Sequence, residues 1–230
     1  MIDMGSEPII EAYLQHLRGK EFPCIAAKTA VAMEQVRCMV ADHLACPKDD
    51  MAILKFLYEF VDAYRKSESI YNSAAIIFKG PEAGDEETFD KFLWQRLQSI
   101  SDLDSAHHQY DSRVDSDPSS PKFSFSLKEE AFYVIGLHPS SSRKARQFIY
   151  PTLVFNAHDQ FEKLRNTNKY EPMKRAVRRR DEKLSGSVNP MLSDFGAASE
   201  VFQYSGRKYD KDWKCPFISH HGEPDGNPST

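Results

Sequence analysis

Three short apolar segments in the second half of the chain most constrain its fold. Residues 123–127 (FSFSL) alternate apolar and polar side chains, whereas residues 131–138 (AFYVIGLH) and 151–156 (PTLVFN) are nearly continuous apolar runs. Both patterns, rich in aromatic and β-branched residues, are typical of β-strands. The sequence therefore predicts consecutive strands across this part of the chain.

Helical periodicity dominates the first half of the chain. Ser6 is a candidate N-cap for a first helix, in which apolar residues recur at helical spacing. Further elements are expected as a short buried strand over residues 73–81 and helices over about 25–44, 51–66 and 85–100. Helices followed by consecutive strands favour an α+β fold with a small, mainly antiparallel sheet.

Bulk composition narrows the classes of protein to be considered. The chain has 230 residues and a net charge of −4, so it carries no overall basic footprint for nucleic acid. It contains no apolar run of the roughly 18–20 residues that a membrane span needs. No signal peptide is recognisable, and four cysteines without CxxC spacing favour reduced thiols in a cytoplasm. We expect one domain over residues 1–217, compatible with a homodimer, and a flexible tail over 218–230.

Reactive side chains gather after the last predicted strand. If Asn156 caps the helix that follows, His158, Phe161 and Arg165 lie at positions i, i+3 and i+7 and share one face. An imidazole beside an aromatic ring, on a face turned towards the core, suits an axial ligand to a flat apolar cofactor. Haem is such a cofactor, because its iron takes a neutral imidazole nitrogen.

Arginines are the natural partners of the two haem propionates, since a guanidinium matches a carboxylate in bidentate geometry. The candidates are Arg143, Arg146 and Arg165. His138, at the end of a predicted strand and before Pro139, is a second candidate ligand. A lone helical histidine is more often a satisfied core residue, so spacing alone leaves haem as one hypothesis among several.

Other groups of reactive residues give weaker signals. The pairs His107-His108 and His220-His221 are candidate metal ligands, but adjacent histidines point in different directions and a solvated loop is favoured. Cys24 and Cys215 each neighbour a proline, and neither has the basic surroundings that stabilise a thiolate. The basic run over residues 174–183 contains acidic residues, which favours a solvated helix face over a nucleic-acid site.

Four segments of the chain resemble the YqcI/YcgG family. They are EFPCIAAKTA (21–30), DPSSPKFSFSL (117–127), GLHPSSSRKARQFIYPTLVFNAHDQFEKLR (136–165) and SDFGAASEVFQYSGRKYDKDWKCPF (193–217), which together extend over nearly the whole chain. The family includes haem-dependent N-hydroxylases of guanidine groups, such as the arginine hydroxylase of cycloserine biosynthesis and the pre-guanitoxin N-hydroxylase. Many other members have no assigned activity.

The resemblance implies a histidine-ligated haem b and an oxygenase reaction that uses O2 and an external electron donor. On geometry we favour His158 as the iron ligand, with His138 as the alternative. The implied substrate is a guanidine compound such as arginine, for which Asp194 and Glu200 are candidate carboxylates.

Two alternatives remain open at the level of sequence. A haem-binding protein without catalysis, acting as a gas sensor or haem carrier, would need the same histidine. A protein that binds no haem and uses its basic helix to contact an acidic partner is the third possibility.

Overall fold

The apolar segments of the sequence form one five-stranded sheet in the order β1-β2-β5-β4-β3. The computed structural model describes residues 5–82, 84–187, 189, 191 and 195–222. The strands are β1 (Val36–His43), β2 (Ser73–Gly80), β3 (Phe125–Leu127), β4 (Glu130–Leu137) and β5 (Thr152–Ala157). β1 and β2 run parallel, and the other neighbouring pairs are antiparallel. The predicted α+β class with a mainly antiparallel sheet is confirmed.

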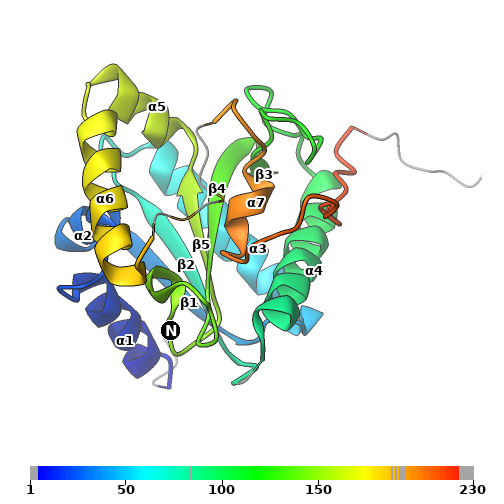
Figure 1. The fold of residues 1–230 in the computed structure, drawn as a ribbon. Helices are drawn as coiled ribbons and strands as arrows, with labels where there is room; N and C mark the ends of the chain where they lie inside the picture. The colour runs from blue at the N-terminus through cyan, green and yellow to red at the C-terminus, as the bar shows by residue number, and fades with distance from the viewer. Residues whose placement is uncertain (1–4, 83, 188, 190, 192–194, 223–230) are drawn as a thin grey trace, which may run out of the picture.

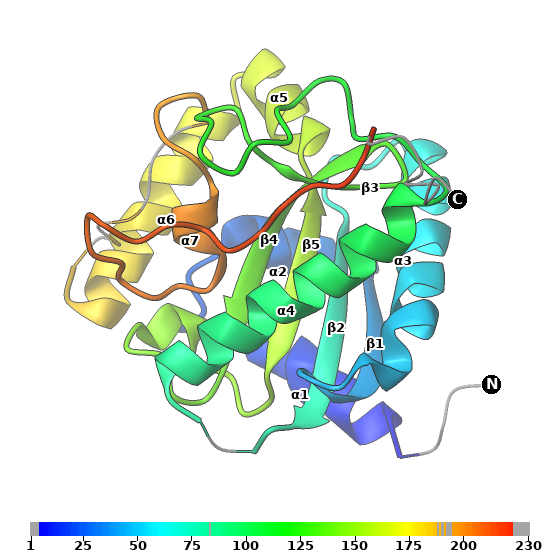
Figure 2. The same ribbon diagram turned by 90° about the vertical axis from the view of Figure 1, so that its right-hand side faces the viewer.

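Helices cover both faces of this sheet (Figures 1 and 2). The helices are α1 (Glu7–Arg18), α2 (Ile25–Ala32), α3 (Asp50–Arg65), α4 (Glu86–Ser105), α5 (Asp159–Asn166), α6 (Tyr170–Ser185) and α7 (Val201–Tyr204), with short 3-10 turns at Pro47–Asp49 and Lys144–Arg146. α3 and α4 pack on one face, and α1, α2 and α6 lie on the other (Figure 1). This arrangement explains why β2 is apolar on both sides and is buried from Ser73 to Phe78.

The two faces of the sheet carry different amounts of core. On the α3–α4 side a large cluster unites the apolar faces of both helices with β2, β4 and β5; it includes Ile53, Leu57, Leu93, Leu97, Ile76 and Phe155. On the other side a smaller cluster joins α1 and α2 to the sheet through Tyr13, Leu17, Val31, Ala75, Ile77 and Val154. The smaller core leaves room for a cavity on that side.

The helix predicted over residues 25–44 is wrong in its second half. α2 ends at Ala32, and Glu34 adopts a left-handed backbone conformation with φ of 57° that reverses the chain. Residues from Val36 onwards then pair in parallel with β2, from Val36 opposite Ser73 to His43 opposite Gly80. The hydrogen bonds of a non-local strand pairing outweigh the local helical pattern here.

The first residues of the predicted tail are docked on α4. Gln98 exchanges hydrogen bonds with the backbone of Ile218, and His221 Nε2 lies 2.9 Å from Asp104 Oδ2. Asp104 also accepts the backbone N–H of Lys128, in the turn between β3 and β4, at 3.0 Å. Residues 223–230 lie outside the described part of the chain, so the flexible tail stays a prediction there. None of the described helices combines the length and apolar character needed to cross a membrane.

We expect Gly136→Ala to destabilise the fold, because Gly136 faces α4 at close range. A Cβ added there would lie 2.6 Å from Phe89 Cε1 and 3.0 Å from Leu93 Cδ1. The expected loss in the free energy of unfolding is about 1–3 kcal/mol, measured by urea denaturation. Gly84→Ala is the control, since its Cβ would approach only Thr88 at 3.6 Å. Equal stability of the two variants would contradict this account of the β4–α4 contact.

Candidate functional site

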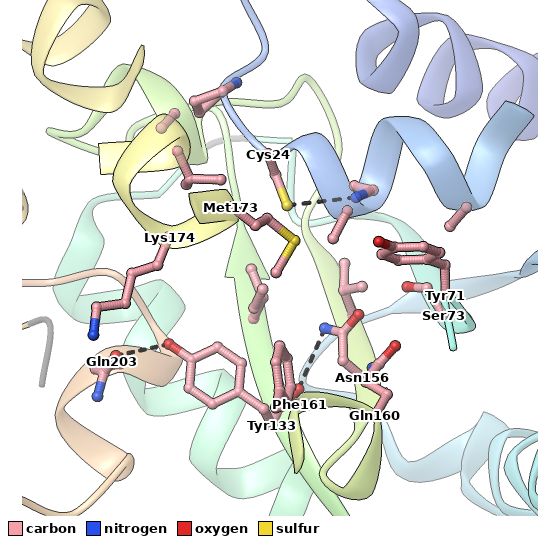
Figure 3. A pocket seen from close by; sticks show the side chains of 18 of the residues that line it. Cys24, Tyr71, Ser73, Tyr133, Asn156, Gln160, Phe161, Met173, Lys174 and Gln203 are labelled. Carbon is pink, nitrogen blue, oxygen red and sulfur yellow. Dashed lines mark hydrogen bonds between the residues drawn. The ribbon is translucent and has the colours of Figure 1, made fainter. Parts of the chain in front are cut away.

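A cavity of about 300 Å³ lies between the sheet and helix α6. We call it the α6 cavity; Figure 3 shows many of the side chains that line it. Its floor is formed by residues of β4 and β5, which include Tyr133, Ile135, Leu137, Val154 and Asn156. α6 contributes Met173, Lys174, Val177, Arg178 and Asp181, and these positions share one helix face. The basic run of α6 is therefore only partly a solvated face.

His158 lies at the junction of β5 and α5. Its backbone N–H donates to Ala131 O at 2.8 Å, and its imidazole lines the α6 cavity. Asn156 belongs to β5 and donates to Tyr133 O, so the prediction that it caps α5 is wrong: the strand continues past it. α5 begins only at Asp159, immediately after His158.

The imidazole of His158 is buried, and neither ring nitrogen has a hydrogen-bond partner among the described residues. Burial lowers the pKa of this ring from 6.5 to about 4, and the positive charges of Arg165 and Arg113 act in the same direction. His158 is thus neutral at neutral pH. A neutral imidazole is the form that binds a metal ion.

Two residues of the C-terminal motif flank this ring. Phe195 packs against it edge-on, with ring centroids 4.3 Å apart. Glu200 Oε1 lies 3.7 Å from His158 Nδ1, and Glu200 Oε2 lies 3.0 Å from Ser124 Oγ and 3.4 Å from Tyr204 Oη. Burial raises the pKa of the Glu200 carboxyl to about 8. At neutral pH the two groups are therefore uncharged neighbours and not an ion pair.

Phe161 and Arg165, predicted on the same face as His158, also line the α6 cavity. The Phe161 ring contacts Tyr133 edge-on, with centroids 5.9 Å apart. The Arg165 guanidinium lies 4.6 Å from the centroid of the Tyr170 ring. The structure thus brings the three side chains together at one cavity, although His158 precedes the helix and does not lie within it.

Arg143 and Arg146 also line the cavity, but their guanidinium groups bind the protein itself. Arg143 Nη2 donates to Asp181 at 2.6 Å and to Ser187 O at 2.7 Å. Arg146 donates to three backbone carbonyl oxygens, those of Gly136, Gln203 and Tyr204. Arg143 therefore holds α6 in place, and Arg146 ties α7 to the end of β4.

His138 faces away from the cavity. Side chains alternate between the two faces of a strand, so Ile135 and Leu137 point to the cavity while Gly136 and His138 face α4. The His138 ring stacks on Phe89 with centroids 4.2 Å apart, and burial lowers its pKa to about 4. His138 is therefore a buried core residue on the α4 side of the sheet.

The remaining sequence candidates lie apart from His158 or are buried as thiols. Cys24 lines the cavity, but burial raises its pKa, and Cys215 lies in the α4-side core with its pKa raised to about 12. His107 is exposed, and His108 packs edge-on against Tyr58. Among the described residues no three His, Cys, Asp or Glu side chains are grouped to hold a metal ion. Asp194 lies outside the described residues.

Sequence reasoning missed two features of the lining. One is the cationic pair Lys174 and Arg178, whose i, i+4 spacing beside apolar Met173 and Val177 signals a second, inward face of α6. The other is a set of uncharged polar side chains along one side of the cavity: Tyr71, Ser73, Asn156 and Gln160 (Figure 3). Tyr71 and Ser73 lie outside the four family segments, whereas Asn156 and Gln160 belong to the segment 136–165.

Charge in the α6 cavity is predominantly positive. The described lining holds five cationic side chains, Arg143, Arg146, Arg165, Lys174 and Arg178. Its described carboxyl groups are those of Asp181, bound by Arg143, and Glu200, protonated at neutral pH. Apolar walls with excess positive charge suit a largely apolar ligand that carries negative groups at its edge.

One known protein family has a sequence model that matches nearly the whole chain. The model of the YqcI/YcgG family matches residues 12–218. The chain belongs to the YqcI/YcgG family. It is 25% identical over 205 residues to the uncharacterized protein YqcI of Bacillus subtilis (strain 168), an alignment that covers 86% of this chain and 76% of the relative. No solved structure matches this YqcI/YcgG chain.

Because the carboxyl of Glu200 is buried, we expect the stability of this YqcI/YcgG protein to depend on pH. Its pKa rises from 4.5 to about 8 on folding. Its contribution to the free energy of unfolding is therefore complete below pH 4.5, where the carboxyl is protonated in both states, and is lost as the pH rises through 8. Glu200→Gln cannot ionise. Between pH 5 and pH 8.5 the stability of this variant relative to wild type should therefore rise by roughly 2–4 kcal/mol. Urea unfolding without haem measures this, and a difference independent of pH would contradict it.

Proposed function

We propose that this chain binds haem b in the α6 cavity with His158 as the axial ligand. We further propose that it N-hydroxylates the guanidine group of arginine or an arginine-like amino acid, using O2 and an external reductant. Membership of the YqcI/YcgG family supports the proposal, because the family includes haem-dependent N-hydroxylases of guanidine groups.

The unpartnered imidazole of His158 is the observation that carries the proposal. Buried polar groups are almost always hydrogen-bonded, and leaving one unsatisfied costs about 1–3 kcal/mol. Among the described residues, neither ring nitrogen of His158 has a hydrogen-bond partner, and the residue is only 5% exposed and lines an apolar cavity. A ligand that coordinates one nitrogen would recover this cost. Iron at the centre of a porphyrin is such a ligand.

The residues around His158 fit the other parts of a haem. The apolar lining, which includes Ile135, Val154, Leu164 and Val177, suits the faces of a macrocycle. Five cations of the described lining are candidates to hold the propionates: Arg143, Arg146, Arg165, Lys174 and Arg178. The three propionate ligands predicted from the sequence are thus kept as candidates, and Lys174 and Arg178 are added to them.

Bound haem supplies the redox chemistry with O2, whereas the chain supplies binding, orientation and exclusion of water. The polar side chains Tyr71, Ser73, Asn156 and Gln160 provide uncharged hydrogen-bonding groups near the cavity floor. Their oxygens are suited to accept N–H hydrogen bonds from a guanidine substrate. Asp194 remains the candidate carboxylate for that substrate.

A haem-binding protein without catalysis is the second candidate, and the charge of the cavity favours it. Among the described lining residues, cations outnumber carboxyl groups, which disfavours a positively charged guanidinium. The same positive charge is compatible with a haem, whose two propionates are negative. Cofactor binding and the reaction are therefore tested separately.

Loading with hemin tests the cofactor and its ligand. Wild-type protein should show a Soret band, and His158→Ala should abolish or shift that band because the axial nitrogen is removed. His138→Ala is the matched control: it should keep the Soret band while losing about 1–3 kcal/mol of stability, because a buried stacked ring is lost. The assignment is wrong if the Soret band survives in His158→Ala and vanishes in His138→Ala.

The reaction is tested on the haem-loaded protein with O2 and a reductant. Free arginine should gain the mass of one oxygen atom, detected by mass spectrometry, and the product should not form without reductant. A panel of guanidine compounds that all remain unoxidised, with the Soret band intact, would leave the non-catalytic haem protein as the function.

A further inference from the structure

The carboxyl group of Glu200 lies beside the imidazole of His158 and does not project freely into the cavity. Its Oε1 lies 3.7 Å from His158 Nδ1, which is roughly 0.5 Å longer than a hydrogen bond. Its side chain is 7% exposed, as is that of His158. If Nδ1 faces Glu200, Nε2 is the nitrogen left for a ligand; it is buried and has no hydrogen-bond partner among the described residues.

The surrounding residues fix the direction of the Glu200 carboxyl. Ser124 Oγ and Tyr204 Oη both lie beside its Oε2, and both side chains are fully buried. Tyr204 Oη is itself held, since it accepts the backbone N–H of Phe125 at 3.1 Å. With Oε2 occupied by these two hydroxyl groups, Oε1 is the oxygen turned towards the imidazole.

Backbone contacts hold the segment that carries Glu200 at both of its ends. Ser199, immediately before it, donates its hydroxyl to Pro118 O at 2.7 Å. At the other end of α7, Arg146 donates to the carbonyl oxygens of Gln203 and Tyr204. The His158–Glu200 approach is therefore a built feature of the fold, not the contact of a loose surface side chain.

We propose that Glu200 is the positioning residue for His158. When Nε2 coordinates iron, Glu200 Oε1 accepts the Nδ1 hydrogen, which fixes the tautomer and the ring plane and makes the imidazole a stronger electron donor. The inference rests on the proposed haem site and gives Glu200 a role towards the ligand in place of its predicted role towards the substrate. It also explains why two residues of the C-terminal motif, Phe195 and Glu200, meet at one histidine.

Electron donation from the imidazole leaves two signatures that do not depend on catalysis. A more basic imidazole strengthens the iron–nitrogen bond and stabilises ferric iron. In haem-loaded Glu200→Leu, which offers Nδ1 no acceptor oxygen, the iron–histidine stretching band of the ferrous protein should move to lower wavenumber, and the midpoint potential should rise. The Soret band should be retained, because His158 is still present. Resonance Raman spectroscopy and a spectroelectrochemical titration measure the two shifts.

Asp181→Asn is the matched control, because Asp181 is a second buried carboxyl group of the same cavity that binds Arg143 and not His158. It should leave the iron–histidine band at the wild-type position. Glu200→Asp, which keeps a carboxyl group one methylene shorter, should give a band between wild type and Glu200→Leu, and it replaces Glu200→Leu should that variant not fold.

Two outcomes would overturn the inference. One is a wild-type band and potential in the Glu200 variants, and the other is an equal shift in Asp181→Asn, which would reflect cavity charge alone. Failure of the proposed function is distinguishable from both, since it appears as a wild-type protein without a Soret band or as a His158→Ala variant with an unaltered one.

Discussion

The guanidinium of Arg146 is the contact on which the candidate site depends. It donates to the carbonyl oxygens of Gly136 in β4 and of Gln203 and Tyr204 at the end of α7. A helix of four residues has no stability of its own, so α7 keeps its place only through such tertiary contacts. Hydrogen bonds from a charged donor are worth about 1.5–3 kcal/mol each in favourable cases. Arg146 therefore fixes one end of the segment that carries Glu200, and the Ser199–Pro118 hydrogen bond holds the other end.

The alternation of side chains along β4 divides the molecule into a structural and a reactive side. The α3–α4 side receives the larger apolar core and His138 stacked on Phe89. The α6 side receives the smaller core, the excess of cationic groups and His158. Both histidines are buried and neutral, so charge alone does not distinguish them. The distinction is that His158 lines the α6 cavity, whereas His138 stacks on Phe89 on the α4 side.

Local sequence patterns predicted the strands and helices whose conformation depends mainly on their own residues. The strands β2, β4 and β5 and the helices α3 and α4 follow from strong apolar periodicity. β1 was missed because its pairing with β2 joins segments far apart in sequence. Whether Arg146 faces a ligand or a carbonyl oxygen likewise depends on where α7 docks. The approach of Glu200 to His158 was missed for the same reason, since no pattern within either segment refers to the other.

The contact of His221 with Asp104 limits where the chain can be shortened for protein production. Asp104 is buried and also binds Lys128 N–H in the β3–β4 turn, so it serves two distant parts of the chain at once. Cutting the gene after codon 217, where the sequence suggests that order ends, would strip the imidazole from this carboxylate and uncover α4. Purification tags therefore belong beyond Gly222, with the preceding residues left intact.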